Sequence, residues 1–279
     1  MKGSRVQGPG STRGVAFTKV VATGNDFVII DNRSLAFKGL PALARKLCDR
    51  KWAVGGDGLL VIEKSKKADF RMRIFNRDGS EAEMCGNGSR CVALYAAVKK
   101  IAKGAMTIDT LAGILKAEVK GDIVKVMLTA PKDIRWNFCL MINKCPYKVN
   151  FVNTGVPHVI HFVDDLDKVD VKNLGSHMRH HGEFGPAGTN ADFVKIAGKN
   201  TIRVRTYERG VEDETLACGT GSVASAIIAA EAEKLESPVT VETRSGEKLK
   251  VYFDAVGGEF KNVYLEGKAQ LVFEGKIEI

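Results

Sequence analysis

Short apolar runs separated by Gly, Asn and Asp follow one another from Phe17 onward, a pattern typical of strands joined by tight turns. In residues 113–128 and 248–265 apolar and polar positions alternate, as they do in antiparallel strands with one buried face. Helical spacing is found mainly in three segments, residues 41–51, 87–100 and 220–234. The pattern predicts an α+β fold with many strands and few helices.

The segments 87–100 and 220–234 are rich in Ala, Val, Leu and Ile almost without interruption, so we expect both helices to be buried on most sides. A helix without a polar face has to be covered all round. The expected architecture is two lobes, each an antiparallel strand barrel wrapped round a central helix.

The two halves of the chain also repeat one another. The segment MCGNGS at 84–89 returns as ACGTGS at 217–222, 133 positions later, and TIDT at 107–110 returns at the same offset as TVET at 240–243. Upstream, NDFVI at 25–29 recurs as NADFV at 190–194 with a different spacing. Only two long copies are present, which excludes a solenoid and indicates two related lobes with pseudo-symmetry and a site in the cleft between them.

The lobe boundary is predicted near residue 131, where a strand pattern ends and the alternation breaks until about Tyr147. Residues 15–131 then form the N-terminal lobe and residues 132–267 the C-terminal lobe. The last stretch, residues 268–279, has the pattern of a strand and is expected to return to the first lobe. Residues 1–14 are rich in Gly and Ser, have no periodic apolar face and are predicted to be a flexible tail.

Composition describes an ordinary globular protein, because 44% of the 279 residues are hydrophobic and 27% are charged. No apolar run is long enough to span a bilayer and no signal peptide is evident, so we expect a cytoplasmic protein without membrane contact. The net charge of +9 is spread along the chain and only 7% of residues are aromatic, which argues against nucleic acid and suits an anionic small molecule. The six cysteines are expected to be reduced.

Cys85 and Cys218 each precede a Gly-rich turn and a predicted helix, where free N–H groups and the helix dipole favour an anion. We therefore expect a lowered thiol pKa at both positions. The two could also be packed structural cysteines, or could form a disulfide, which a reducing compartment disfavours. If neither of these interpretations applies, the two cysteines can act as an acid and a base on opposite faces of one carbon, which inverts a stereocentre.

Removing a proton next to a carboxylate builds negative charge on the carboxylate oxygens, and this charge needs hydrogen-bond donors. Backbone N–H groups at the two helix starts can supply them without a metal or a cofactor. The candidate donors are Gly86, Asn87, Gly219 and Thr220.

From about Phe17 to the C-terminus the chain resembles the diaminopimelate epimerase family. The resemblance is carried by GNDF at 24–27, GGDG at 55–58, Asn76 with DGS at 78–80, MCGNG at 84–88, Gly155 with Pro157-His158, Asn190, ERG at 208–210 and ACGTG at 217–221. It implies two similar lobes and Cys85 and Cys218 as the catalytic thiolate and thiol. It also implies interconversion of LL- and meso-diaminopimelate, in lysine and peptidoglycan precursor biosynthesis, without a cofactor.

Four residues are implied by the resemblance to hold the substrate, largely through its distal amino-acid end: Asn25, Asn76, Asn190 and Arg209. At the reacting end, Glu208 and His158 are implied to assist. These residue types suit the task, because an Arg clamps a carboxylate and side-chain amides can accept from an ammonium or donate to a carboxylate. One position departs from the family, since Val156 stands where an Asn is frequent.

Three other functions stay open at this level. Proline and hydroxyproline racemases share the fold and the paired cysteines, but they typically carry His where this chain has Asn87. A second related group replaces the thiols by one carboxylate, and a basic binding protein with redox-sensing cysteines is the alternative from another class. A homodimer is compatible with the sequence.

Three patterns are not assigned to the site. His177, His180 and His181 lie close together, but no Cys or acidic residue accompanies them at ligand spacing, so we expect solvated histidines and no metal site. The GGDG segment at 55–58 lacks the Lys and Ser/Thr of a phosphate loop and is interpreted as a turn. Cys91, Cys139 and Cys145 are interpreted as structural, the last two flanking a linker.

Overall fold

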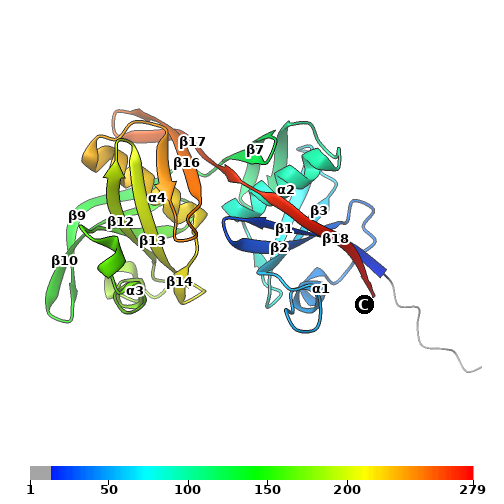
Figure 1. The fold of residues 1–279 in the computed structure, drawn as a ribbon, viewed down its shortest axis with the longest axis horizontal. Coiled ribbons are helices and arrows are strands. Elements are labelled where there is room, and N and C mark those ends of the chain that lie inside the picture. The colour runs from blue at the N-terminus through cyan, green and yellow to red at the C-terminus, as the bar shows by residue number, and fades with distance from the viewer. Residues whose placement is uncertain (1–13, 279) are drawn as a thin grey trace, which may run out of the picture.

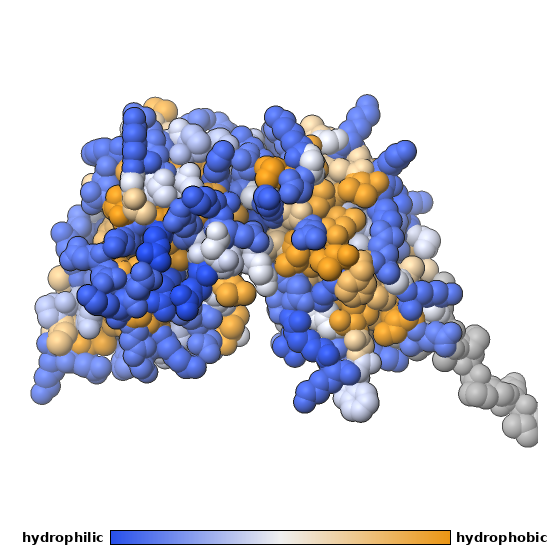
Figure 2. Space-filling view, in the orientation of Figure 1, coloured by the Kyte–Doolittle hydropathy of each residue, from blue (hydrophilic) through white to orange (hydrophobic). Residues whose placement is uncertain are grey.

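The computed structural model describes residues 14–278, which form two lobes linked through strand β17 (Figure 1). The N-terminal lobe contains β1 (Gly14–Ala22), β2 (Asn25–Asp31), α1 (Leu40–Leu47), β3 (Gly58–Glu63), β4 (Phe70–Asn76), β5 (Glu81–Ala82), α2 (Gly86–Val98), β6 (Ala105–Thr110), β7 (Gly113–Lys120), β8 (Ile123–Met127) and β18 (Gln270–Glu278). The C-terminal lobe contains β9 (Lys132–Ile142), β10 (Cys145–Asn153), β11 (Pro157–Phe162), η1 (Leu166–Lys168), α3 (Val171–Arg179), η2 (Gly182–Phe184), β12 (Asn190–Gly198), β13 (Thr201–Glu208), β14 (Asp213–Thr215), α4 (Gly219–Glu233), β15 (Val239–Glu242), β16 (Lys248–Val256) and β17 (Glu259–Lys268). The surface is hollowed between the two lobes (Figure 2).

Both lobes use the same order of strand pairing. In the first lobe β1–β2, β3–β4, β6–β7 and β7–β8 are antiparallel, and β10–β11, β12–β13, β15–β16 and β16–β17 correspond to them in the second. The parallel pairs β2–β3 and β4–β6 correspond to β11–β12 and β13–β15. Each parallel pair is joined through a helix, as a parallel connection requires. The predicted α+β fold of two related lobes is confirmed, and the parallel pairs are a feature that the alternation pattern did not predict.

The helices α2 and α4 are the centres of the two lobes. Residues 86–96 of α2 are all buried, and in α4 the buried run continues to Ala230 with Thr220 as the one partly exposed member. The buried apolar residues of both helices belong to one hydrophobic cluster that runs through both lobes. This confirms the two central helices that the apolar runs predicted.

Two segments of the second lobe differ from the sequence-based expectation. Residues 132–142 form strand β9 where we expected the alternation to be broken by a linker, so Cys139 and Cys145 lie exposed in two paired strands. The alternation is hidden because Asp133 and Asn137 have left-handed backbone and the register with β10 shifts twice.

Helix α3 was not expected, because its mean hydropathy is low and Gly175 interrupts it. That glycine allows close packing, since a Cβ there would lie 2.5 Å from Cβ of Tyr207.

The chain ends in the lobe where it begins. Strand β18 pairs antiparallel with β1, from Gly14 opposite Glu278 to Val21 opposite Gln270. The predicted tail, residues 1–14, lies outside the described residues except for Gly14, which begins β1. No helix in the described part of the chain is long and apolar enough to cross a membrane.

Candidate active site

The N-termini of the two central helices lie against each other. Cys85 and Cys218 are the residues immediately before α2 and α4, and both have extended backbone. A Cβ on Gly219 would lie 3.8 Å from Cα of Gly86 and 3.7 Å from Oδ1 of Asn87. The first turns of the two helices are therefore in contact, and one small region receives N–H groups from both.

A single leucine of the linking strand β17 closes the floor of this region. A Cβ at Gly86 would lie 3.5 Å from Cδ2 of Leu265, and a Cβ at Gly219 would lie 3.2 Å from the same atom. Leu265 is fully buried. The relative position of the two helix starts is therefore set by the strand that joins the lobes.

The environment raises the pKa of both thiols, which corrects the expectation of lowered values. Burial is the largest cause at Cys85 and Cys218, and the nearby Glu208 carboxylate adds to it at each. The Gly88 N–H, 3.4 Å from the Cys85 sulfur, acts in the opposite direction but is outweighed. Loss of water therefore outweighs the hydrogen bonds to the sulfurs, and burial favours the neutral thiol at both positions.

Asn25 lies beside Cys85 and is held there by Asp57. Nδ2 of Asn25 donates to Oδ2 of Asp57 at 2.6 Å, and Oδ1 of Asn25 lies 3.9 Å from the Cys85 sulfur and 3.4 Å from Nδ2 of Asn87. Arg50 in turn donates to the Asp57 carboxylate at 2.8 Å. Asp57 belongs to the GGDG segment that the sequence analysis interpreted only as a turn, so its part in orienting Asn25 was missed.

On the other side, His158 lies between Asp192 and Thr220. Nδ1 of His158 is 2.7 Å from Oδ2 of Asp192, and Nε2 is 3.0 Å from the Thr220 hydroxyl. That hydroxyl is 3.4 Å from the sulfur of Cys218. Asp192 was not among the predicted site residues. A signal was present, because it lies two positions after Asn190 in the repeated NADFV segment and so on the same face of a strand.

The pairing of β11 with β12 places His158 opposite Asn190. The Asn190 side chain in turn holds the backbone of Arg209. Its Oδ1 accepts from the Arg209 backbone N–H at 2.8 Å, and its Nδ2 donates to the Pro157 carbonyl at 2.9 Å. Burial raises the pKa of Glu208, the last residue of β13. The Arg209 guanidinium is half-buried and donates weakly to the Gly188 carbonyl at 3.4 Å.

Asn76 lies apart from this network. It is exposed at the end of β4, and its amide donates to the Ser80 hydroxyl at 2.9 Å. Near Val156, the Asn153 side chain accepts from the Gly155 N–H at 3.0 Å and so caps its own loop. The structure therefore places Asn25 and His158 beside the two helix starts, links Asn190 to Arg209, and leaves Asn76 apart from them.

Arg90 is a further buried group that the sequence analysis did not select. It is fully buried on α2, five positions after Cys85, and donates to the Thr23 hydroxyl at 2.6 Å and to Oδ1 of Asn87 at 2.8 Å. Its charge opposes the effect of burial on the Cys85 pKa. Arg90 thus fixes the Asn87 side chain and supplies positive charge behind the first thiol.

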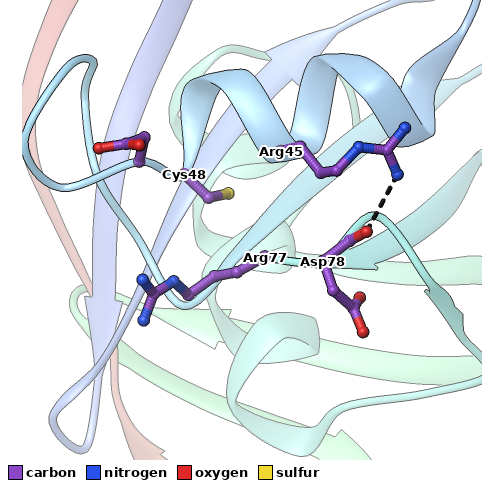
Figure 3. A pocket seen from close by; sticks show the side chains of 5 residues that line it. Arg45, Cys48, Arg77 and Asp78 are labelled. Carbon is purple, nitrogen blue, oxygen red and sulfur yellow. Dashed lines mark hydrogen bonds between the residues drawn. The ribbon is translucent and has the colours of Figure 1, made fainter.

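Two other polar groups lie elsewhere. A cavity of about 340 Å³ in the N-terminal lobe is lined by Arg45, Cys48, Asp49, Arg77 and Asp78 (Figure 3). Its two cations and two carboxylates balance, and it contains none of the predicted site residues. The ring nitrogens of the clustered histidines form hydrogen bonds with nearby backbone groups. His177 Nδ1, for example, lies 2.8 Å from the Asn173 carbonyl oxygen.

Comparisons with known proteins identify the family of this chain. The family model described as diaminopimelate epimerase matches residues 17–134 and 150–272. A protein named diaminopimelate epimerase from Aquifex aeolicus (strain VF5) is 44% identical over 274 residues, covering 94% of this chain and 97% of its own length. One of the same name from Archaeoglobus fulgidus is 42% identical over 285 residues, covering 95% and 97%.

Solved structures of lower identity show the same fold. A phenazine biosynthesis protein of the PhzF family from Bacillus anthracis superimposes with a TM-score of 0.75 at 20% identity, covering 96% of this chain and 100% of that one. A hydroxyproline epimerase from Agrobacterium vitis gives 0.72 at 14%, covering 96% and 93%.

Proposed function

This chain belongs to the diaminopimelate epimerase family, and from that premise we propose that Cys85 and Cys218 carry out the reaction as its two acid–base groups. The family's enzymes are isomerases, and the reaction interconverts LL- and meso-diaminopimelate in lysine and peptidoglycan precursor biosynthesis. The observation that carries the proposal is the contact between two helix starts, each preceded by a cysteine. A planar carbanion bound there would have one thiol on each face.

In the proposed reaction one cysteine, as thiolate, removes the α-proton, and the other, as thiol, delivers a proton from the opposite face. The first helical N–H groups that donate to a backbone carbonyl are those of Ser89 and Ser222. The N–H groups before them have no carbonyl partner within their helices, so they can stabilise the charge that develops on the substrate carboxylate. These proposed donors are Gly86, Asn87, Gly219 and Thr220.

We propose that the distal amino-acid end is held by Asn25, Asn76, Asn190 and Arg209, while Glu208 and His158 act at the reacting end. Asn25 and Asn190 support this role because each is already oriented by fixed partners. Asn76 would have to be brought to the substrate by movement of the turn after β4. The half-buried guanidinium of Arg209 is suited to a carboxylate.

The function is tested by incubating the reduced protein with LL-diaminopimelate, with no added cofactor, and separating the stereoisomers by chromatography. We expect the meso form to appear, and we expect L-proline and trans-4-hydroxy-L-proline to stay unchanged under the same conditions. Turnover of a proline substrate without turnover of diaminopimelate would refute the proposed substrate. A two-thiol mechanism also needs reduced cysteines, so we propose that the protein acts in the cytoplasm.

The pH dependence of kcat/KM follows from the raised thiol pKa values. The proposed base is a thiolate, and burial favours the neutral thiol, so the active fraction of free enzyme grows as pH rises. We expect kcat/KM to increase continuously between about pH 6 and pH 9 instead of levelling off near neutrality. Initial rates at constant ionic strength measure this profile. A profile that is flat from about pH 6 would contradict the raised values and show that the thiol pKa is lowered, as the sequence alone suggested.

We further propose a homodimer formed through β18. In the described chain this strand pairs only with β1, so its other edge is open, and Val272 and Phe273 on it are each half exposed. Apolar residues gather on the N-terminal lobe in the region that β18 crosses (Figures 1 and 2). An open edge with exposed apolar side chains suits a second copy of the same strand.

We expect light scattering after size exclusion to give twice the chain mass and Phe273→Glu to give the monomer mass. Trp52→Glu, at an exposed residue on a loop after α1, is the matched control and should leave the mass unchanged. A wild-type monomer at micromolar concentration would refute the dimer.

A further inference from the structure

A continuous chain of polar groups leads from the sulfur of Cys218 into the core of the second lobe. The Cys218 sulfur is 3.4 Å from the Thr220 hydroxyl, which is 3.0 Å from Nε2 of His158. Nδ1 of the same ring is 2.7 Å from Oδ2 of Asp192, and the other oxygen of Asp192 accepts from the Thr206 hydroxyl at 2.7 Å. Four side chains from three strands and one helix thus meet in one line.

The chemistry of the last member fixes the direction of each hydrogen bond. A carboxylate oxygen only accepts, so Nδ1 of His158 carries the proton that Asp192 binds. In the neutral ring Nε2 is then unprotonated and accepts from the Thr220 hydroxyl. The hydroxyl oxygen keeps a lone pair that faces the S–H of Cys218. Every donor between Cys218 and Asp192 therefore points towards Asp192.

Burial isolates the inner members of this line, His158 and Asp192, from water. The side chains of His158 and Asp192 are both 0% exposed. Gly221 packs directly on the carboxylate, since a Cβ there would lie 2.5 Å from Oδ1 of Asp192. The charged groups that act on Cys218 are Glu208 on β13 and Asp192 on β12, while α4 itself contributes the Thr220 hydroxyl and the Gly221 N–H. His158 on β11 is one hydrogen bond further away, through the Thr220 hydroxyl.

We propose that Asp192 is a positioning residue of the epimerase reaction, which acts with Thr220 to connect His158 to Cys218 as a proton relay. The Cys218 S–H bond breaks and its proton passes to the Thr220 oxygen, while the Thr220 hydroxyl proton passes to Nε2 of His158. The products are a Cys218 thiolate and an imidazolium, whose Nδ1–H stays bonded to Asp192. The inference rests on the proposed acid–base role of Cys218.

The relay gives the two thiols different support. Cys85 has the Asn25 oxygen, the Gly88 N–H and the fixed charge of Arg90 near it, and no imidazole of the described chain is bonded to it or to those groups. Cys218 has two acidic neighbours that oppose its ionisation, and so needs an internal acceptor for its proton. Forming a thiolate next to a buried carboxylate is feasible when an imidazolium lies between them.

The first test compares Thr220→Ser with Thr220→Val. Both keep the backbone N–H of the proposed anion site, and only serine keeps the hydroxyl. In a Cys85→Ser background, the pH dependence of Cys218 alkylation by iodoacetamide, followed by mass spectrometry, reports thiolate formation without any substrate. We expect valine to slow alkylation near neutral pH at least about tenfold, one unit of thiol pKa, and serine to stay within about twofold of threonine.

The second test is Asp192→Asn, for which two accounts predict opposite signs. If Asp192 acted on Cys218 only through its negative charge, removing that charge would make the thiol more acidic and speed alkylation. The relay predicts slower alkylation, because the imidazolium loses its carboxylate partner, and a fall in kcat of about 100-fold or more. Faster or unchanged alkylation in Asp192→Asn, or equal rates in Thr220→Val and Thr220→Ser, would overturn the relay.

Controls separate this inference from the function on which it rests. In a Cys218→Ser background we expect the rate of Cys85 alkylation to be unaffected by Asp192→Asn. A similar fall in the Cys85 alkylation rate would indicate a general disturbance of the fold and refute a specific relay. If Asp192→Asn does not fold, the comparison of Thr220→Ser with Thr220→Val still tests the relay. Alkylation needs no turnover, so a wild-type protein that failed to epimerise diaminopimelate would refute the proposed function without affecting this readout.

Discussion

Cys85→Ser and Cys218→Ser are each expected to lower epimerisation by about 10³-fold or more, because a hydroxyl is a far weaker acid and its anion is far less accessible than a thiolate. Serine fits both positions as a residue before a helix, so neither change should disturb the helix starts. Initial rates of meso-diaminopimelate formation from the LL form measure the effect. The loss should be similar in the reverse direction, since each thiol acts once as acid and once as base.

Cys139→Ser is the matched control for this pair. Cys139 is an exposed thiol on β9, and the change should leave the rate within about twofold of wild type, as surface substitutions normally do. Near-normal turnover in either Cys85→Ser or Cys218→Ser would contradict the two-thiol mechanism.

The second large effect is expected at Arg209. Neighbouring arginines of β13 are paired, Arg203 with Asp167 at 3.0 Å and Arg205 with Glu214 at 2.7 Å. Within residues 14–278 no carboxylate lies within ion-pair distance of Arg209. A half-buried guanidinium with no anionic partner has donors to spare for the distal carboxylate of the substrate.

We expect Arg209→Ala to lower kcat/KM about 100-fold, equivalent to about 3 kcal/mol, as loss of charged hydrogen bonds predicts. The distal end stays bound in ground state and transition state alike, so the change should appear mainly in KM. Arg203→Ala, which removes an exposed and paired arginine of the same strand, should change KM little. An unchanged KM in Arg209→Ala would remove Arg209 from substrate binding.

The features that the sequence predicted well are those that depend on local pattern. The runs of Ala, Val and Ile after each cysteine predicted α2 and α4, because a helix apolar on all sides must lie inside a lobe. The internal repeat predicted two lobes of one design, and the paired order of strands confirms this. The fold was therefore accessible from periodicity and repetition.

What the sequence did not predict depends on contacts between distant segments. The thiol pKa values are raised because burial removes water from Cys85 and Cys218, which a helix-start motif does not reveal. Asp192 and Asp57 each lie in a recognisable motif, yet their roles follow only from their contacts with His158 and Asn25. Strand β9 was hidden by left-handed residues at Asp133 and Asn137 that interrupt its alternation.

The central claim is that two groups on opposite faces of the α-carbon exchange protons with it, and hydrogen labelling tests this most directly. LL-diaminopimelate is incubated with the enzyme in D₂O, the reaction is stopped at low conversion, and the remaining LL form and the meso product are separated and examined by NMR and mass spectrometry. With two thiols, the product receives deuterium from the second thiol, while substrate that returns regains its own proton from the first. The account therefore predicts deuterium at the inverted centre of the product and little in the remaining substrate. Product that carries the original α-hydrogen, or equal labelling of product and remaining substrate, would contradict it.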